Sequence, residues 1–377
     1  MKADFLLRGG RVIDPAAGID EIRDIALCGD RIIAADSAAQ IIDAAGCLVC
    51  PGLIDFHTHL FFGVSGISID PDRLIAQGTT AAVDAGSAGS ANYERFSDII
   101  GQSRIRIKSF INFYPFGQLG GGAVEDYSPD ICRIDELEPV VDKHRDEILG
   151  LKLRLSRGIV PEGSGAEALR RCVAAADELE QRLGLPLRVC VHTTDSPVSA
   201  EELADCLRPG DIFCHCYQGM GNPIVTADGT IEPGVLRARG RGVLFDAANG
   251  RSNFSFEVAK KALAAGFLPD IISTDMTVMT FGPSPHVGSL PRVLSKYLAL
   301  GLRLPETLRR CTEIPARLMG LEGQCGTLRP GACADLAVFR LEDRTWEQQD
   351  CRGETLRCGQ LLVPQMTILG GKIVTVR

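Results

Sequence analysis

The chain has 377 residues, 45% of them hydrophobic and 23% charged, with a formal net charge of −8 at pH 7. This length suits one large domain, or a large domain with a smaller companion. The acidic balance and the lack of a basic stripe argue against nucleic-acid partners. Because no apolar run could span a bilayer and the first residues lack a signal-peptide core, we expect a cytoplasmic protein without membrane partners.

Short strands separated by turns are predicted at both ends of the chain. Gly9-Gly10 is a hairpin signal near the start, and Gly370-Gly371 is a second one near the end. Neither end is long enough to bury a core of its own. Residues 1–50 and 322–377 are therefore predicted to form one small β domain, of the β-sandwich type.

Between residues 51 and 321, apolar runs alternate with amphipathic segments. The runs resemble buried parallel strands and lie at Leu53–His59, Thr79–Ala85, Ile105–Tyr114, Leu149–Leu155, Leu187–His192, Ile212–Tyr217, Val243–Ala247 and Ile271–Asp275. Helical periodicity occurs at Ala166–Leu183, Ala200–Leu207, Phe254–Ala265 and Leu290–Leu300. This alternation predicts an α/β protein with a closed (β/α)8 TIM barrel. An open doubly wound sheet is the alternative, but no glycine-rich phosphate fingerprint follows the first run.

Metal-ligand side chains lie at the C-terminal ends of these runs. His57 and His59 share one side of the first strand, because side chains alternate along a strand. Later runs supply Lys152, His192, His215 and Asp275. Each has an ordinary structural explanation by itself, such as a core histidine or a helix-capping aspartate. In a barrel, however, these strand ends meet at one mouth, and together they predict a site for two divalent metal ions.

Lys152 and the two cysteines beside His215 need separate explanations. A lysine ammonium cannot ligate a metal ion, but a buried lysine readily loses its proton. The neutral amine of Lys152 can then add carbon dioxide, and the resulting carbamate would bridge two ions. Cys214 and Cys216 flank His215, so strand alternation predicts that both sulfurs point away from it and pack outward. Most of the fourteen cysteines are expected to be small buried hydrophobic residues.

With the motif Pro51–His59, this set of residues resembles the binuclear branch of the amidohydrolase superfamily. The resemblance implies that His57, His59 and Asp275 bind the more buried ion and that His192 and His215 bind the second. It also implies that N6-carboxylated Lys152 bridges the two ions. Zinc is the most common metal, although ligand type alone does not decide it. A metal-bridging hydroxide would attack the substrate carbonyl, with Asp275 as the acid–base residue.

The resemblance is closer to a deacetylase-like group than to dihydroorotases, which carry an arginine where this chain has Phe61. We therefore expect hydrolysis of an amide or ester bond in a small metabolite that carries a carboxylate. Arg154 is the candidate for binding that carboxylate, with charge balance as the alternative. Asn249 either contacts the substrate carbonyl or holds its strand end. His286 follows the eighth run and is a further candidate, although a solvated loop histidine is the more ordinary explanation.

Three other functions are alternatives. The first is a cyclic-amide hydrolase of the dihydropyrimidinase, hydantoinase or dihydroorotase type. The second is a mononuclear deaminase, which the lysine on the fourth run disfavours. The third is a metal-free, non-catalytic homologue, which the complete set of ligand positions disfavours. The expected partner is a small-molecule substrate; homo-oligomers are common among barrel hydrolases of this size, but no stretch marks an interface.

Overall fold

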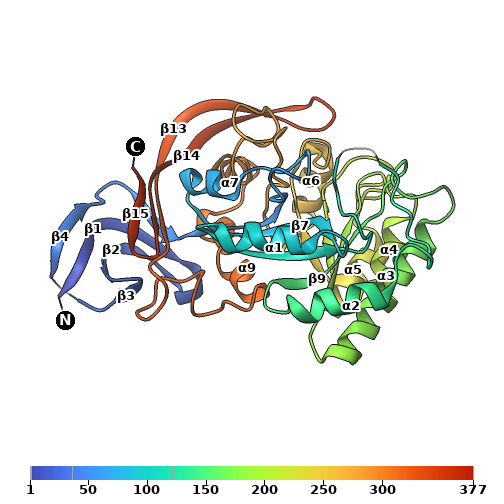
Figure 1. Cartoon of the computed structure of the whole chain (residues 1–377). Coiled ribbons are helices and arrows are strands. Elements are labelled where there is room, and N and C mark those ends of the chain that lie inside the picture. Colours follow the sequence, from blue (N-terminus) through green and yellow to red (C-terminus); the bar gives the residue numbers. More distant parts are fainter. Residues whose placement is uncertain (1, 36, 121–122, 377) are drawn as a thin grey trace.

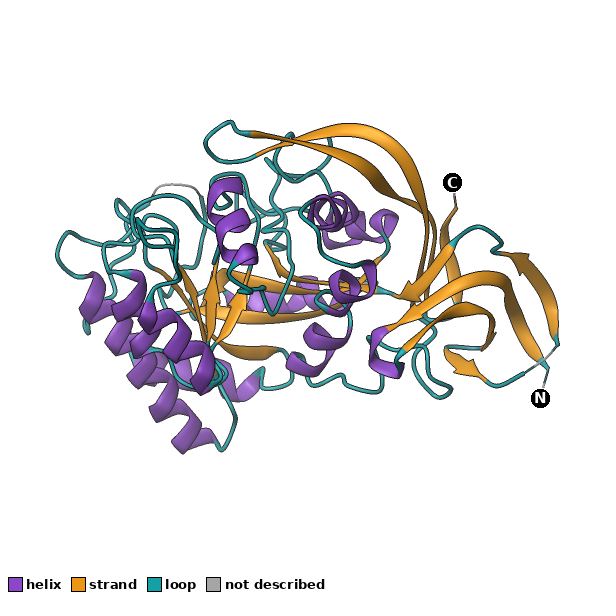
Figure 2. Ribbon diagram, turned by 180° about the vertical axis from the view of Figure 1, so that it is seen from behind, coloured by secondary structure: helices purple, strands orange, loops and turns teal. Residues whose placement is uncertain are grey.

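The computed structural model describes residues 2–35, 37–120 and 123–376. Its strands form two sheets, an eight-stranded one and a seven-stranded one. The eight-stranded sheet lies at one end of the molecule, and the seven-stranded sheet with its helices makes up the rest (Figures 1 and 2). The protein is therefore an α/β structure with a second, mostly β portion.

The seven-stranded sheet contains the first seven predicted runs. Its strands are β6 (Leu53–Thr58), β7 (Thr79–Gly89), β8 (Arg106–Asn112), β9 (Ile148–Arg154), β10 (Arg188–His192), β11 (Ile212–Cys214) and β12 (Leu244–Asp246). They pair in sequence order, and each pair is parallel. All seven C-terminal ends therefore lie at the same edge of the sheet.

The eighth predicted run is not a regular strand, but it bridges both edges of this sheet. Ile271 forms a parallel bridge with Asp246 of β12, and Met276 forms one with Thr58 of β6. The amide of His59 also donates to the carbonyl oxygen of Met276 at 2.9 Å. This segment therefore joins the last strand to the first.

Helices pack around the seven-stranded sheet (Figure 2). They are α1 (Tyr93–Gln102), α2 (Ile134–Lys143), α3 (Gly165–Leu183), α4 (Ala200–Cys206), α5 (Pro233–Arg241), α6 (Phe256–Ala264), α7 (Leu290–Ala299), α8 (Leu304–Arg309) and α9 (Glu313–Leu318), with short 3-10 helices at Pro15–Ala17 and Pro71–Gln77. Helices α4, α6 and α7 begin after Ser199, Ser255 and Ser289, whose hydroxyls accept backbone N–H groups. The four predicted helical segments are confirmed as α3, α4, α6 and α7.

Both ends of the chain contribute to the mixed sheet. Its strands are β1 (Ala3–Asp14), β2 (Ile19–Cys28), β3 (Arg31–Ile33), β4 (Ala38–Asp43), β5 (Leu48–Pro51), β13 (Leu336–Gln349), β14 (Thr355–Leu369) and β15 (Lys372–Val376). Strand β5 connects the two groups, because it pairs parallel with β1 and antiparallel with β13. Buried residues from both ends, such as Leu7 and Ile368, share one hydrophobic cluster.

Strands β13 and β14 extend from this sheet as a long hairpin that curves over α7 (Figure 1). At its tip, the amide of Cys351 donates to the carbonyl oxygen of Phe254 at 3.0 Å. The amide of Phe256 donates to a carboxylate oxygen of Asp350 at 2.9 Å. The hairpin therefore fixes the segment that leads into α6.

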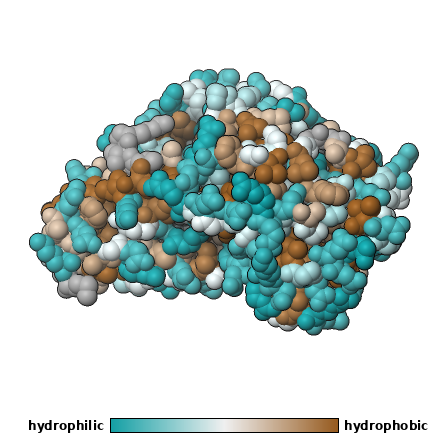
Figure 3. Space-filling model, in the orientation of Figure 1, coloured by the Kyte–Doolittle hydropathy of each residue, from teal (hydrophilic) through white to brown (hydrophobic). Residues whose placement is uncertain are grey.

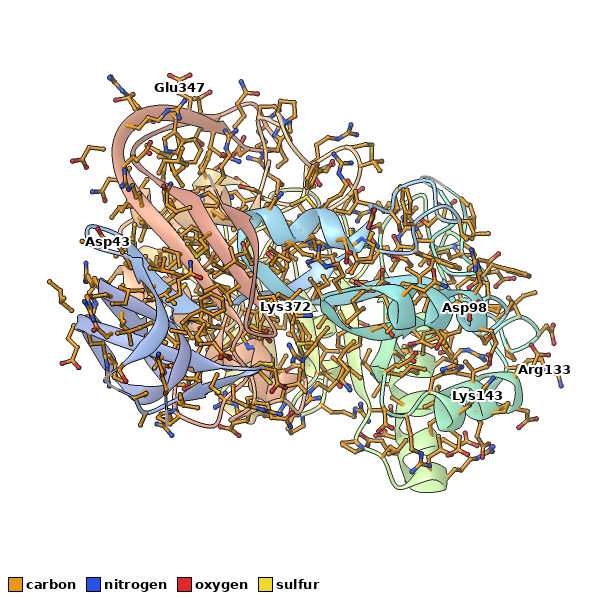
Figure 4. All side chains as sticks on the ribbon, turned by 60° about the vertical axis from the view of Figure 1, so that its left-hand side comes forward. Asp43, Asp98, Arg133, Lys143, Glu347 and Lys372 are labelled. Carbon is orange, nitrogen blue, oxygen red and sulfur yellow. The ribbon has the colours of Figure 1, made fainter. Side chains whose placement is uncertain are left out.

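Charged side chains lie on the outside of the molecule. Asp98 of α1 and Glu347 of β13, both labelled in Figure 4, are exposed. On the face drawn in Figure 3, apolar residues form patches between hydrophilic ones. No helix within the described ranges is long and apolar enough to cross a membrane. The cysteines are free and most of them are buried, as expected.

Candidate metal centre

His57, His59 and Asp275 form the first group of ligand atoms. The Nε2 atoms of His57 and His59 lie 3.7 and 3.2 Å from Oδ1 of Asp275. Both histidines project from the end of β6, with ring centroids 6.0 Å apart. One ligand atom from each of the three residues lies within 4.8 Å of the others, so the group could hold one metal ion.

His192 and His215 form the second group. Nδ1 of His192 lies 2.8 Å from Nε2 of His215. Nδ1 of His215 donates to the carbonyl oxygen of Ala248 at 2.6 Å, which directs Nε2 into the site. The ring centroid of His215 lies 5.1 Å from that of His57, so the two groups adjoin.

Lys152 lies beside the first group, as predicted. Its Nζ is 3.4 Å from Nε2 of His57, and the residue is 1% exposed. Gly86 makes room for it: a Cβ at that position would lie 2.5 Å from Cβ of Lys152. The structure thus brings together all six residues expected to ligate metal, from β6, β9, β10, β11 and the eighth run.

The pKa of Lys152 shifts in the direction opposite to the one expected from burial. Burial is the largest influence on its pKa and lowers it, but Cys190, Cys214 and Asp275 together raise the pKa above its ordinary value. The sulfurs of Cys190 and Cys214 lie 3.6 and 4.0 Å from Nζ. Burial alone therefore does not release the proton.

The predicted orientation of Cys214 is wrong. Its sulfur faces Lys152 inside the sheet and lies 3.1 Å from the sulfur of Cys190. The reason is the backbone at His215, where φ is +57°. This left-handed residue interrupts strand alternation, so Cys214 and His215 both face the site. Cys216 lies in a different core cluster from Cys214, one that also contains residues of the surrounding helices.

Strained backbone gathers at this edge of the sheet. Non-glycine residues with positive φ include Asp195 at 53°, His215 at 57°, Ala248 at 35° and Asp275 at 53°. Each follows the C-terminal end of a strand or lies at the end of the eighth run. Such conformations cost about 1–3 kcal/mol and often occur at functional sites.

Buried partners orient the histidine rings. Oδ2 of Asp246 lies 3.3 Å from Nδ1 of His57, and Oγ of Ser87 lies 2.9 Å from Nδ1 of His59. Partners of this kind fix the tautomer and orientation of a metal-ligating ring. Sequence reasoning missed both residues. The position of Asp246 at the end of the seventh run could have indicated it, whereas Ser87 carries no such signal.

The charges of the ligand atoms suit cations. Burial lowers the pKa of His57 and His192 well below the ordinary value and that of His215 to about 3, so these rings are neutral. Burial would raise the pKa of Asp275, but His59, His57 and His215 hold it well below its usual range. Neutral imidazoles and an ionised carboxylate, with the outer ring nitrogens of His57, His59 and His215 already bonded, are a donor set that fits divalent metal ions.

Arg154 lies at the end of β9 but is already paired. Its Nη1 donates to Oε1 of Glu125 at 2.6 Å, and Glu125 is 1% exposed. The hydroxyl of Tyr127 also donates to Glu125 and accepts from the amide of Arg154 at 3.1 Å. The guanidinium is thus held at the edge of the site by a buried carboxylate that the sequence did not indicate.

Asn249 is fully buried, and its amide is bonded within the protein. Nδ2 donates to the carbonyl oxygen of Ser273 at 2.7 Å. Oδ1 accepts from Nζ of Lys296 and from the hydroxyl of Tyr297. These contacts are those expected of a residue that holds the end of its strand, rather than of one that contacts the substrate carbonyl.

His286 lies beneath the β13–β14 hairpin. Its carbonyl oxygen accepts from Nε2 of Gln348, and the neighbouring Pro285 carbonyl accepts from the amide of Gln349 at 2.9 Å. Within the described parts of the chain, no hydrogen bond joins His286 to a residue of the metal centre.

The chain is similar in sequence and in fold to known proteins. Residues 270–375 match the family described as Amidohydrolase family. The chain is similar to a deacetylase of Agrobacterium fabrum (strain C58 / ATCC 33970), with 32% identity over 365 residues, covering 93% of this chain and 86% of that protein. It is also similar to the crystal structure of an adenine deaminase, with a TM-score of 0.89, 27% identity, and coverage of 99% and 100%. The crystal structure of a dihydroorotase matches with a TM-score of 0.86, 29% identity, and coverage of 99% of both chains.

Proposed function

We propose that this chain removes an acyl group from a small metabolite at the centre described above. The chain belongs to the amidohydrolase superfamily and is a metal-dependent hydrolase of the deacetylase type. The observation that carries the proposal is the convergence of His57, His59 and Asp275 beside Lys152, with the pair His192 and His215 adjoining. Membership also supports the finer fold, with the eighth run closing a (β/α)8 barrel and residues 1–50 and 322–377 forming the small β domain.

Six residues are proposed to hold two divalent ions. His57, His59 and Asp275 would hold one, His192 and His215 the other, and Lys152 would be shared between them. Zinc suits these nitrogen and oxygen ligands. When bound, the ions would lower the pKa of water and polarise a carbonyl group.

Lys152 is proposed to carry carbon dioxide on Nζ. The neutral amine attacks the carbon atom, forming an N–C bond as one C=O π bond opens, and it loses one proton; the resulting carbamate would supply oxygen ligands to the ions. The raised pKa of Lys152 means that this step needs nearby positive charge, which disfavours the ammonium form.

Asp275 is proposed to be the acid–base residue. Its pKa is held well below the usual range, so it starts as a carboxylate and can accept a proton from the attacking water. It then returns this proton to the leaving nitrogen or oxygen. Nδ2 of Asn253 donates to Oδ2 at 2.7 Å, which keeps the carboxylate in place.

Arg154 is proposed to bind a carboxylate of the substrate. Its ion pair with Glu125 engages Nη1, and the hydrogen bonds of the described residues leave Nη2 and Nε available. A buried ion pair of this kind holds the guanidinium in one orientation, ready for a planar anion.

A cyclic-amide hydrolase is the second candidate, because of the likeness to a dihydroorotase structure. The environment of Phe61 weighs against dihydroorotate itself. Phe61 is fully buried, and its ring centroid lies 5.3 Å from that of Phe96, so no cationic side chain reaches the substrate from this position.

The test is a substrate screen with zinc-loaded protein. N-acyl amino acids, acylated hydroxy acids, hydantoins and dihydroorotate would be compared before and after chelation, with His57→Ala as the inactive variant. His144→Ala is the matched control, because His144 contacts Glu94 at 3.0 Å outside the centre. We expect hydrolysis of an acylated substrate that chelation abolishes and zinc restores. Faster hydrolysis of a cyclic amide would favour the second candidate, and absence of both zinc and hydrolysis would favour a metal-free homologue.

A further inference from the structure

Lys296, on α7, is a buried lysine that the proposed reaction does not use. It is 1% exposed, and its Nζ lies 3.4 Å from the ring centroid of Phe254. The rings of Tyr297 and Phe256 lie 5.6 and 5.9 Å away. No carboxylate within the described ranges forms an ion pair with it, and its hydrogen-bond acceptor is Oδ1 of Asn249.

The C-terminal hairpin closes this aromatic cage. Its tip bonds to the backbone of Phe254 and Phe256, and the amide of Leu362 on β14 donates to Oγ of Ser295 at 2.8 Å. Water is therefore excluded from a cationic group. Burial lowers the pKa of Lys296 to about 7, although Cys358 and Asp350 act to raise it.

Fold stability does not explain a lysine here. Burying an ammonium without a carboxylate costs free energy, and an apolar residue of similar size is often neutral or more stable. The surrounding rings offset part of this cost. The hydrogen bond from Nζ to Asn249 is the directed contact that remains to be explained, and it indicates a functional role.

A series of hydrogen bonds, joined at Ser273 through that residue's own covalent bonds, leads from Lys296 to the metal centre. Nζ donates to Oδ1 of Asn249, and Nδ2 of Asn249 donates to the carbonyl oxygen of Ser273 at 2.7 Å. Oγ of Ser273 donates to Oδ1 of Asp246 at 2.6 Å. Oδ2 of Asp246 lies 3.3 Å from Nδ1 of His57.

We propose that Lys296 is a positioning residue, which orients Asn249 and, through Ser273 and Asp246, the ring of His57. Below its pKa of about 7, Lys296 is an ammonium that can only donate hydrogen bonds. In this form it selects the amide orientation in which Oδ1 of Asn249 faces it and Nδ2 faces Ser273. A hydroxyl such as that of Tyr297 can donate or accept a hydrogen bond, so it would not select one orientation of the Asn249 amide. The inference rests on the proposed function, since it assigns His57 to the metal centre.

The test compares Lys296→Met, which keeps the volume but removes the donor, with Lys296→Gln, which keeps an N–H donor. Lys261→Met, at an exposed lysine of α6, is the matched control. For Lys296→Met we expect an unchanged or higher Tm, a kcat and a zinc affinity each about tenfold lower, and a KM within about twofold. Lys296→Gln should recover part of both losses, and Lys261→Met should equal wild type.

A second measurement does not depend on activity. Histidine-selective ¹⁵N spectra of the chelator-treated full chain report which ring nitrogen of His57 carries the proton. We expect one tautomer, protonated at Nδ1, in wild type and a mixture in Lys296→Met. An unchanged tautomer with activity within twofold of wild type, or an activity loss that follows a lower Tm, would overturn the inference. Absence of zinc binding and hydrolysis in wild type would contradict the proposed function alone, because the tautomer still reports on Lys296.

Discussion

Oδ2 of Asp246 lies 3.3 Å from Nδ1 of His57, while Nε2 of the same ring faces Nζ of Lys152 at 3.4 Å. The carboxylate holds the outer nitrogen and so directs the inner one into the centre. A partner of this kind also raises the basicity of a ligating imidazole. The centre thus depends on residues outside its own set of ligands.

Asp246→Asn should lower zinc affinity and kcat by about 10- to 100-fold each, the range measured for such outer partners. Chelator competition and initial rates would check this. Asp98→Asn is the control, because Asp98 is an exposed residue of α1 (Figure 4). A zinc affinity of Asp246→Asn within twofold of wild type would contradict the role of Asp246 in orienting His57.

Asp275→Asn should reduce kcat by ~10²–10⁴, the range for a positioned acid–base group. Metal content would be measured on the same samples, so that loss of rate is separated from loss of metal. Asp195→Asn is a matched control, since Asp195 has the same φ of 53° at the end of another strand. Near-normal turnover by Asp275→Asn with metal retained would contradict the acid–base role.

Gly86→Ala should disturb Lys152 directly. The new Cβ would lie 2.5 Å from Cβ and 2.6 Å from Cγ of Lys152, at a φ of +84°. Overpacking of this kind costs about 1–3 kcal/mol. Gly229 has a φ of +87°, and a Cβ added there would meet no atom within 4 Å, so Gly229→Ala measures the backbone strain alone. Denaturant unfolding and metal content should show a larger loss for Gly86→Ala, and equal losses would mean that the contact is unimportant.

Arg154→Met should discriminate between substrates. For a substrate with a free carboxylate we expect kcat/KM to fall by about 10- to 100-fold, as for loss of one charge-assisted hydrogen bond of ~1.5–3 kcal/mol. For the amide-capped analogue, kcat/KM should fall far less, and comparing the two substrates on one variant makes the result independent of protein stability. Arg171→Met serves as a control nearby, because Arg171 donates to the backbone of Tyr127 at 3.0 Å. Equal losses on both substrates would indicate charge balance instead.

Stability should depend on pH through Lys296. Its pKa is lowered from 10.5 to about 7 in the folded chain, so between these values the unfolded chain binds a proton that the folded chain does not. The free energy of unfolding of wild type therefore rises with pH across this window. The groups that act against this shift are Cys358 and Asp350, and Tyr297 is the other titratable neighbour. Urea unfolding should show that any stability advantage of Lys296→Met is greatest near pH 7 and shrinks as pH approaches 10.5; a constant difference would contradict this.

Periodicity in the sequence was sufficient for most of the fold. Seven apolar runs became parallel strands, because a strand buried on both faces must be apolar throughout. The eighth run and the residue after it meet the two edges of the sheet through isolated bridges, so the run is not a regular strand, and it ends at Asp275 with a positive φ. The same kind of local backbone departure at His215 turned Cys214 inward and made its predicted orientation wrong.

The sequence by itself determined the six candidate ligands, because strand alternation and the shared direction of parallel strands bring their side chains to one edge. Only the tertiary structure decided their partners. Glu125 reaches Arg154, and Lys296 reaches Asn249, across separations that follow no period along the chain. Such contacts depend on how helices and loops close over the sheet. For that reason His57 could be recognised from its own strand, whereas the line of residues that orients it could not.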